Sequence, residues 1–126
     1  MVPGGKFVES PGERRVRRVV DRLLKEPREI SAREARGEVR QPFFRPVSLA
    51  LRNGPVEKLS AFTREISASG VGLLHNAPIP SGETVITLTG ASGTPIHLRA
   101  YIVWCKPCGE GWYLSGAHFI DVTFSG

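Results

Sequence analysis

The sequence has little that would indicate an exported, membrane-spanning or cysteine-stabilised protein. It contains two cysteines in 126 residues, too few for the disulfide framework of a small secreted domain. No apolar run approaches the roughly 18–20 residues of a membrane-spanning helix, and residues 1–6 lack the apolar core of a signal peptide. With 40% hydrophobic and 23% charged residues, the composition is that of an ordinary globular domain. We therefore expect one cytoplasmic domain without a membrane span.

Residue patterns typical of an enzyme are also missing. The three histidines, His75, His97 and His118, stand singly on different expected strands, and no partner residues identify a nucleophile and its base. Cys105 and Cys108 have the spacing of half a zinc site, but a structural zinc needs four ligands. A hairpin loop is the better interpretation of that segment. We predict no enzymatic activity, no cofactor and no bound metal.

Positive charge, in contrast, is concentrated in the first half of the chain. Residues 1–64 carry 15 Lys and Arg against 8 Asp and Glu, whereas residues 65–126 carry 2 against 4. Arginine supplies 12 of the 15 cations in the first half, and its planar guanidinium suits two-point contact with phosphate or guanine. The first half therefore favours an anionic partner: a nucleotide, a nucleic acid, a membrane surface or an acidic protein.

The chain divides into a leader, a helical segment and a strand-rich domain. Residues 1–12 are rich in proline and glycine and are expected to form a disordered leader. Residues 13–37 form the expected N-terminal helical segment, with an amphipathic helix from Glu13 to Lys25. Its apolar stripe consists of Val16, Val19, Val20, Leu23 and Leu24. Packing of this stripe on a sheet is the preferred interpretation, and a partner-binding or dimerising helix is the alternative.

Residues 38–126 are expected to be mainly β. Short alternating runs are bounded by turn signals, among them Asn53-Gly54 and the turn at 107–109. The expected strands are 47–51, 56–64, one starting at 71, 84–89, 96–104 and 112–121. Six short strands without intervening helices indicate an antiparallel barrel or sandwich.

The order of the motifs in this region is similar to that of the PilZ domain family, over about residues 38–122. An arginine loop with Arg40 and Arg45 is followed some twenty residues later by Glu65, Ser67 and Gly70. The family signature is R-x-x-x-R followed by (D/N)-x-S-x-x-G. Here the arginine spacing is one residue longer, and Glu stands at the Asp/Asn position. The resemblance implies a six-stranded antiparallel β-barrel with a flanking helix that binds cyclic di-GMP.

The residues expected to hold the nucleotide come from the arginine loop, the serine–glycine turn and a strand with an aromatic residue. They are Arg40, Arg45, Glu65, Ser67, Ser69, Gly70 and Trp104. Arginines can fork onto phosphate or guanine, the glutamate and hydroxyls can accept or donate hydrogen bonds, and an indole can stack on a base. We expect both arginines to converge with the turn. Without the resemblance, the turn and the tryptophan are more simply a polar loop and a strand residue.

Two hypotheses for function follow. In the first, the protein is a signalling receptor in which cyclic di-GMP orders the N-terminal segment against the barrel. In the second, it is an adaptor that does not bind the nucleotide and docks on a protein of motility, secretion or envelope synthesis. Nucleic-acid binding is not favoured, because the sequence shows neither an aromatic-interleaved RNA-reading strand nor a helix-turn-helix pair.

Overall fold

The strands of the structure form one antiparallel sheet, preceded by a helix. The computed structural model describes residues 10–24, 40–52, 57–90 and 92–124. The elements are α1 (Pro11–Leu24), β1 (Gln41–Pro42), β2 (Pro46–Leu51), β3 (Glu57–Ile66), β4 (Gly70–His75), β5 (Gly82–Thr89), β6 (Pro95–Gly109) and β7 (Trp112–Phe124). The predicted Asn53-Gly54 turn lies outside the described residues, although β2 and β3 pair antiparallel as a hairpin would require.

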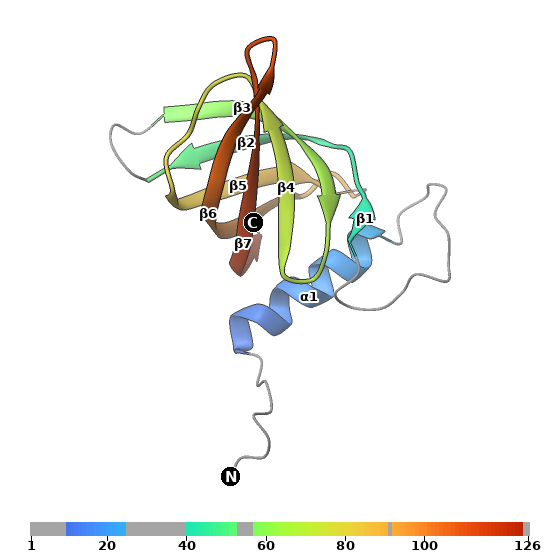
Figure 1. Cartoon of the computed structure of the whole chain (residues 1–126). Coiled ribbons are helices and arrows are strands. Elements are labelled where there is room, and N and C mark those ends of the chain that lie inside the picture. Colours follow the sequence, from blue (N-terminus) through green and yellow to red (C-terminus); the bar gives the residue numbers. More distant parts are fainter. Residues whose placement is uncertain (1–9, 25–39, 53–56, 91, 125–126) are drawn as a thin grey trace.

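Six strands close into a barrel. The strand order is β3-β2-β5-β6-β7-β4, and the additional pairing of β4 with β3 completes the circle. The short β1 pairs with the last two residues of β3, Glu65 and Ile66. Figure 1 shows the barrel with α1 across its lower end and the tip of the β6–β7 hairpin projecting at the opposite end. The predicted mainly β fold, a six-stranded antiparallel barrel with a flanking N-terminal helix, is confirmed.

The barrel interior follows from the alternation of apolar residues along the strands. Leu49, Leu73, Ile86, Leu98 and Phe119 come from five different strands, and all are fully buried or nearly so. The residues next to each of these along its strand face the outside of the barrel, because successive side chains of a strand face opposite sides. The burial of this apolar surface is the main stabilising contribution to the fold.

The β6–β7 hairpin is longer than the sequence indicated. The predicted turn at 107–109 is wrong, since β6 continues to Gly109 and pairs there with Trp112. The chain reverses through Gly109, Glu110 and Gly111, all of which have positive φ. Cross-strand pairing with β7 therefore overrides the local turn signal of Pro107. Cys105 and Cys108 consequently lie on a strand and not in a loop.

Helix α1 begins earlier than predicted. The Ser10 hydroxyl accepts a hydrogen bond from the Glu13 backbone N–H, and the Glu13 carboxylate accepts one from the Ser10 N–H. This reciprocal capping box starts the helix, and proline is well suited to its first turn. Pro11 and Gly12 therefore belong to α1, which begins two residues before the expected start at Glu13. The remainder of the predicted leader, 1–9, and of the helical segment, 25–37, lies outside the described residues.

The apolar stripe of α1 packs on the barrel, as predicted. Val16, Val19, Val20 and Leu23 are buried, and α1 contacts β7. At Gly12 the helix approaches β7 so closely that a Cβ there would lie 2.6 Å from the Ile120 carbonyl oxygen. Glycine at position 12 therefore allows the close approach of the helix to the strand.

A two-point ion pair adds to this attachment of the helix. The Arg15 guanidinium donates from Nε and Nη2 to the two carboxylate oxygens of Asp121, at 2.9 and 2.8 Å. The hydrogen bond from Arg15 lowers the pKa of Asp121, so the carboxylate stays charged under ordinary conditions. Asp121 lies on β7, and α1 and β7 are therefore joined by polar as well as apolar contacts.

A buried histidine joins β4 to β7. His75 is inaccessible to solvent, and its Nδ1 lies 2.7 Å from the Ala77 carbonyl oxygen. Because a carbonyl can only accept, Nδ1 carries the proton, and Nε2 then accepts from the Ser115 hydroxyl at 2.6 Å. Ser115 is also fully buried. This serine–histidine pair is therefore out of reach of any substrate and is part of the core.

The buried histidine predicts an acid-sensitive stability. Burial lowers the pKa of His75 below its ordinary value of 6.5, so the unfolded chain binds a proton more readily than the folded one. We expect the free energy of unfolding to fall as the pH drops below 6.5, by at most about 1.4 kcal/mol per pH unit from this group. Urea unfolding across this range would measure it.

The matched variant for this test is His75→Gln, which retains a hydrogen-bonding side chain but does not titrate. It should lose the pH dependence near neutrality while keeping the one from carboxylates at lower pH. An unchanged slope in this variant would contradict the assignment to His75.

Candidate functional site

The pairing of β1 with β3 places Arg40 beside the serine–glycine turn. Gln41 pairs with Ile66 and Pro42 with Glu65, so Arg40, one residue earlier, comes level with Ser67. The register between β3 and β4 shifts between Thr63 and Glu65. This irregularity changes the alternation of inward- and outward-facing side chains just before the turn. The sequence spacing that looked one residue too long is therefore compatible with a position of Arg40 at the turn.

The turn between β3 and β4 is held by its own hydrogen bonds and by β7. The Ser67 N–H donates to the Gly70 carbonyl at 2.9 Å, and the Ser69 N–H donates to the Ser67 hydroxyl at 3.2 Å. The Ser69 carbonyl accepts from the Phe119 N–H at 2.8 Å. A Cβ on Gly70 would collide with the Ala117 carbonyl oxygen. Glycine is required at this position because two backbones approach each other closely.

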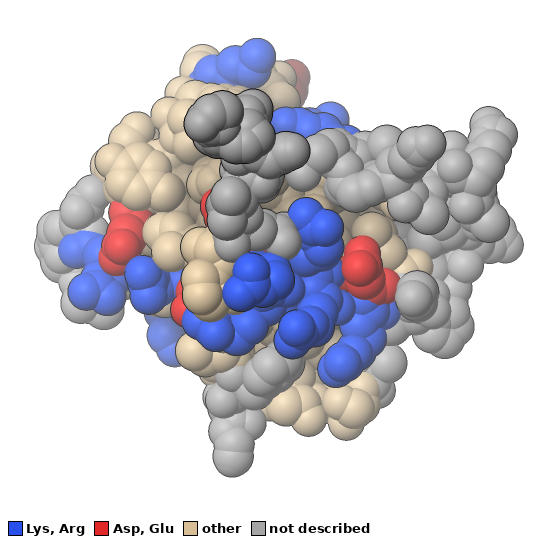
Figure 2. Space-filling model, turned by 90° about the horizontal axis from the view of Figure 1, so that it is seen from below, with Lys and Arg blue, Asp and Glu red and all other residues tan. Residues whose placement is uncertain are grey.

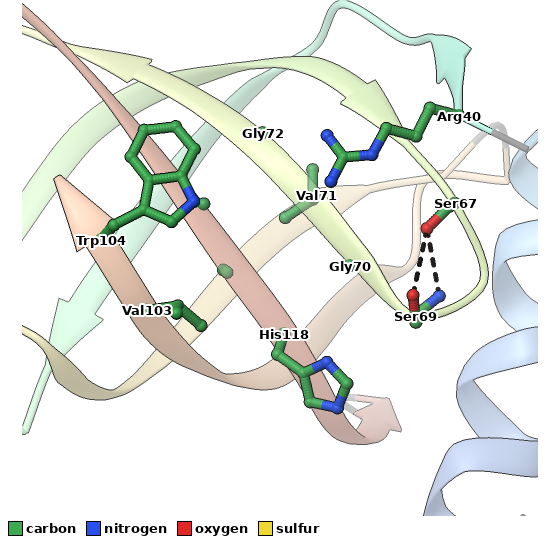
Figure 3. A pocket seen from close by; sticks show the side chains of 11 residues that line it. Arg40, Ser67, Ser69, Gly70, Val71, Gly72, Val103, Trp104 and His118 are labelled. Carbon is green, nitrogen blue, oxygen red and sulfur yellow. Dashed lines mark hydrogen bonds between the residues drawn. The ribbon is translucent and has the colours of Figure 1, made fainter. Parts of the chain in front are cut away.

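A pocket of about 250 Å³ opens between this turn and β6. It is lined by Arg40, Ser67, Ser69, Gly70, Val71, Gly72, Val103, Trp104, Gly116, Ala117 and His118. Figure 3 shows the Arg40 guanidinium and the two serine side chains on one side, and the Trp104 indole with Val103 on the other. The pocket thus combines a cation, hydroxyl groups and an aromatic ring around a wall of small residues.

Trp104 is partly exposed and accessible from the pocket. Its side chain rests against Gly116, where a Cβ would lie only 2.6 Å from the indole Cε2. The Lys106 ammonium lies 5.5 Å from the ring centroid. With 43% of its surface exposed, Trp104 is not a core residue. An exposed aromatic ring beside a cation is suited to stacking on a flat, electron-rich ligand.

The Arg40 guanidinium is held by Glu65. Nη1 of Arg40 lies 2.8 Å from Oε2 of Glu65, and the carboxylate rests on Gly72, where a Cβ would lie 2.7 Å from the same oxygen. The side chain of Arg40 is 69% exposed and that of Glu65 27%. Glu65 is not among the residues that line the pocket. It fixes the position of the cation at the rim.

Arg45 lies apart from the pocket. Its guanidinium donates to the Thr89 carbonyl at 3.4 Å and lies 4.9 Å from the centroid of the Phe43 ring. Its backbone is bound to β3, since its N–H donates to the Thr63 hydroxyl and its carbonyl accepts from the Thr63 N–H. Of the two arginines expected to converge with the turn, the structure brings Arg40 alone to it.

Two phenylalanines attach the arginine loop to the barrel. Phe43 is 1% exposed and anchors the loop in the core. Phe44 points outward, is 66% exposed, and stacks on Phe62 at 5.2 Å between centroids. The loop is therefore attached to β3 on both faces of the sheet, which leaves little freedom for Arg45 to change its direction.

Several pocket residues were not identified as site residues from the sequence. Val103 and His118 line the pocket, as do Gly72 and Gly116. Gly72 pairs with Gly116, and the space beside each is taken by a neighbouring side chain, that of Glu65 at Gly72 and that of Trp104 at Gly116. The signal was the run of small residues Ser115-Gly116-Ala117 in the last strand, which only the pairing of β7 with β4 places opposite the turn.

The cysteines do not form a site in this geometry. Residues three apart on a strand lie about 10 Å from each other and face opposite sides, so Cys105 and Cys108 are too distant to bridge. Within residues 10–24, 40–52, 57–90 and 92–124, no group of three His, Cys, Asp or Glu side chains could hold a metal. In the same ranges, no helix is long and apolar enough to cross a membrane.

A family model described as PilZ domain matches residues 33–125, which is 93 of the 126 residues. The matched region contains the whole barrel, β1 and every residue that lines the pocket. A search of curated proteins found no match.

Proposed function

Because the chain belongs to the PilZ domain family, whose members are binding or adaptor domains and in general bind cyclic di-GMP, we propose that this protein is a cytoplasmic receptor for cyclic di-GMP. The observation that carries the proposal is the pocket in which Arg40, the Ser67 and Ser69 hydroxyls and the exposed Trp104 surround one space. Such a set can bind a phosphate and stack on a purine at the same time.

The size of the pocket fits part of the ligand. At about 250 Å³ it is slightly below the roughly 300–1,000 Å³ of sites that enclose a drug-sized molecule. One guanine with its adjoining phosphate would occupy the pocket, and the rest of the cyclic dinucleotide would lie outside against the rim.

Binding would exchange the partners of Arg40. In the structure Arg40 is paired with Glu65. A phosphate offers the same bidentate acceptor geometry as a carboxylate, so it can replace Glu65 on the guanidinium. The carboxylate of Glu65 then becomes available to accept hydrogen bonds from the donor edge of a guanine. In the proposed complex Arg40 therefore binds the phosphate and Glu65 binds the base.

The signal would pass through the N-terminal segment. Arg40 follows directly on the stretch of chain that joins α1 to β1. Under this proposal, a ligand bound to Arg40 orders the N-terminal segment against the barrel. The size of the response is limited by the difference in ligand affinity between the two arrangements of this segment.

Isothermal titration of the full chain with cyclic di-GMP tests the proposal. We expect saturable binding that GMP at the same concentration does not reproduce, because GMP lacks the second nucleotide that extends over the rim. Absence of heat at high micromolar cyclic di-GMP, with a folded protein by circular dichroism, would contradict the receptor function.

An adaptor function is the second candidate, and an exposed apolar strip on β6 favours it. Tyr101, Val103 and Trp104 are 47%, 56% and 43% exposed and lie close together on one strand. Contiguous exposed aromatic and aliphatic groups are typical of protein-binding surfaces. Under this candidate, Tyr101→Ser would weaken binding to a protein partner, whereas nucleotide titration would show no heat.

The exchange of partners at Arg40 predicts that Glu65→Gln strengthens ligand binding. The substitution removes the competing charge while its amide oxygen can still accept from guanine. A partly exposed ion pair contributes about 0.2–1 kcal/mol, so we expect affinity for cyclic di-GMP to rise up to about fivefold. Titration calorimetry measures the change. The control is Glu83→Gln, which removes from β5 a carboxylate that lies near Arg52, and it should have no effect on the affinity. Weaker binding by Glu65→Gln would instead show that the carboxylate charge is needed in the complex.

A further inference from the structure

The outer face of α1 is almost entirely cationic. The exposed residues of this helix are Pro11, Arg14, Arg15, Arg17, Arg18, Asp21 and Arg22. Figure 2, which views the molecule from the α1 end, shows the resulting patch of basic side chains. The helix has five arginines against Glu13 and Asp21, so 14 residues hold a charge of +3 in a protein with a net charge of +5.

The arrangement of the arginines suits an extended anionic surface. Arg14, Arg18 and Arg22 recur every four residues and so form a row about 12 Å long on one side of the helix, with Arg17 beside it. The helix cannot turn this row inward, because its other face is buried on β7 and Arg15 is paired with Asp121. The arginines of this row are therefore exposed on the outer face of the helix.

We propose that the outer face of α1 binds the surface of a membrane that contains anionic phospholipid. Clusters of four or more arginines on an amphipathic helix bind such surfaces by electrostatic attraction. The helix would lie on the headgroups without inserting, because its apolar residues Val16, Val20 and Leu23 are already buried on the barrel. This inference does not rest on the proposed nucleotide pocket.

The same face lacks the aromatic rings on which single-stranded nucleic acids stack. Along the described helix the exposed residues are arginines, one aspartate and one proline. Arginines also contact duplex phosphates and guanine, so duplex DNA is one arm of the test. A lipid surface requires only positive charge at the right height.

Co-sedimentation with vesicles tests the proposal. The full chain is mixed at low salt with vesicles of phosphatidylcholine alone or of phosphatidylcholine with phosphatidylglycerol, and the bound fraction is measured. We expect binding to the charged vesicles alone, and its loss at high salt because ions screen the attraction. The variant Arg14→Gln, Arg18→Gln, Arg22→Gln should bind about 100-fold more weakly, since each arginine contributes about fivefold.

The control removes the same charge from the barrel. The control variant is Arg52→Gln, Lys58→Gln, Arg99→Gln. It neutralises three exposed cations, one next to β2, one on β3 and one on β6, in that order. This variant should sediment with charged vesicles nearly as the natural chain does. Circular dichroism establishes that both variants are folded. Equal weakening by both variants, or no sedimentation of the natural chain with charged vesicles, would overturn the proposal. Retention on duplex DNA without any vesicle binding would overturn it in favour of a nucleic acid.

Discussion

Replacing Arg40 by alanine is expected to weaken cyclic di-GMP binding by about ten- to a hundredfold without unfolding the barrel. A hydrogen bond to a charged group contributes about 1.5–3 kcal/mol, which corresponds to that range of affinity. The side chain of Arg40 is 69% exposed and its described ion pair is with Glu65 alone, so little stability depends on it. Calorimetry gives the affinity, and thermal unfolding establishes that the fold is retained.

Arg45→Ala is the matched comparison for this prediction. It removes the same charge from the same loop, but from a guanidinium that contacts the Thr89 carbonyl and the Phe43 ring outside the pocket. We expect a smaller loss of affinity than for Arg40→Ala. The reverse order, with Arg45→Ala the more damaging of the two, would show that the ligand recruits Arg45 and would contradict the assignment of the pocket.

Gly70→Ala is expected to destabilise the barrel strongly. The added methyl group would collide with the Ala117 carbonyl oxygen on β7, and a backbone atom cannot move aside as a side chain can. Overpacking of this kind costs about 1–3 kcal/mol, which would lower the melting temperature by about 5–15 °C in a domain of this size. Thermal unfolding followed by circular dichroism measures the shift.

Gly72→Ala, two residues further along the same strand, is the control for Gly70→Ala. Its methyl group would meet the end of the Glu65 side chain, which is flexible enough to move. We expect a shift of the melting temperature well below that of Gly70→Ala. Equal shifts in the two variants would mean that the loss of glycine at a strand position, and not contact with β7, determines the stability.

The strands and the helix could be predicted because the patterns that specify them are local in the sequence. Alternation of apolar residues identified the strands, and the apolar stripe of α1 identified its packing face. Closure of the barrel, by contrast, depends on the pairing of β3 with β4. That pairing follows from the short Ser67–Gly70 turn, whose form was predicted only as a polar connection.

The candidate site was less predictable, because it depends on register. The interpretation of Arg40 rested on counting residues from the strand, and the count was one too many for the family signature. Pairing of Gln41 with Ile66 resolves this, since it brings Arg40 level with Ser67. The direction of the Arg45 side chain is set by Thr63 and Phe43, which contact the loop in three dimensions and leave no pattern in the sequence.

The end of β6 shows how a tertiary contact can cancel a local signal. Pro107, Cys108 and Gly109 are typical turn residues, yet they continue the strand because β7 provides hydrogen-bonding partners as far as Trp112. Long-range pairing was also needed to reveal the buried contact between His75 and Ser115, which are 40 residues apart.

Strand β7 is common to the pocket and to the helix. Gly116, Ala117 and His118 line the pocket, and Ile120 and Asp121, a few residues later, hold α1. Suppose that a nucleotide in the pocket changes the affinity of the arginine face for a lipid surface by a certain factor. The lipid surface must then change the affinity for the nucleotide by the same factor, because the two binding equilibria share one thermodynamic cycle. A vesicle would then act as an effector of the receptor, and measuring either affinity in the presence of the other ligand would report the coupling in both directions.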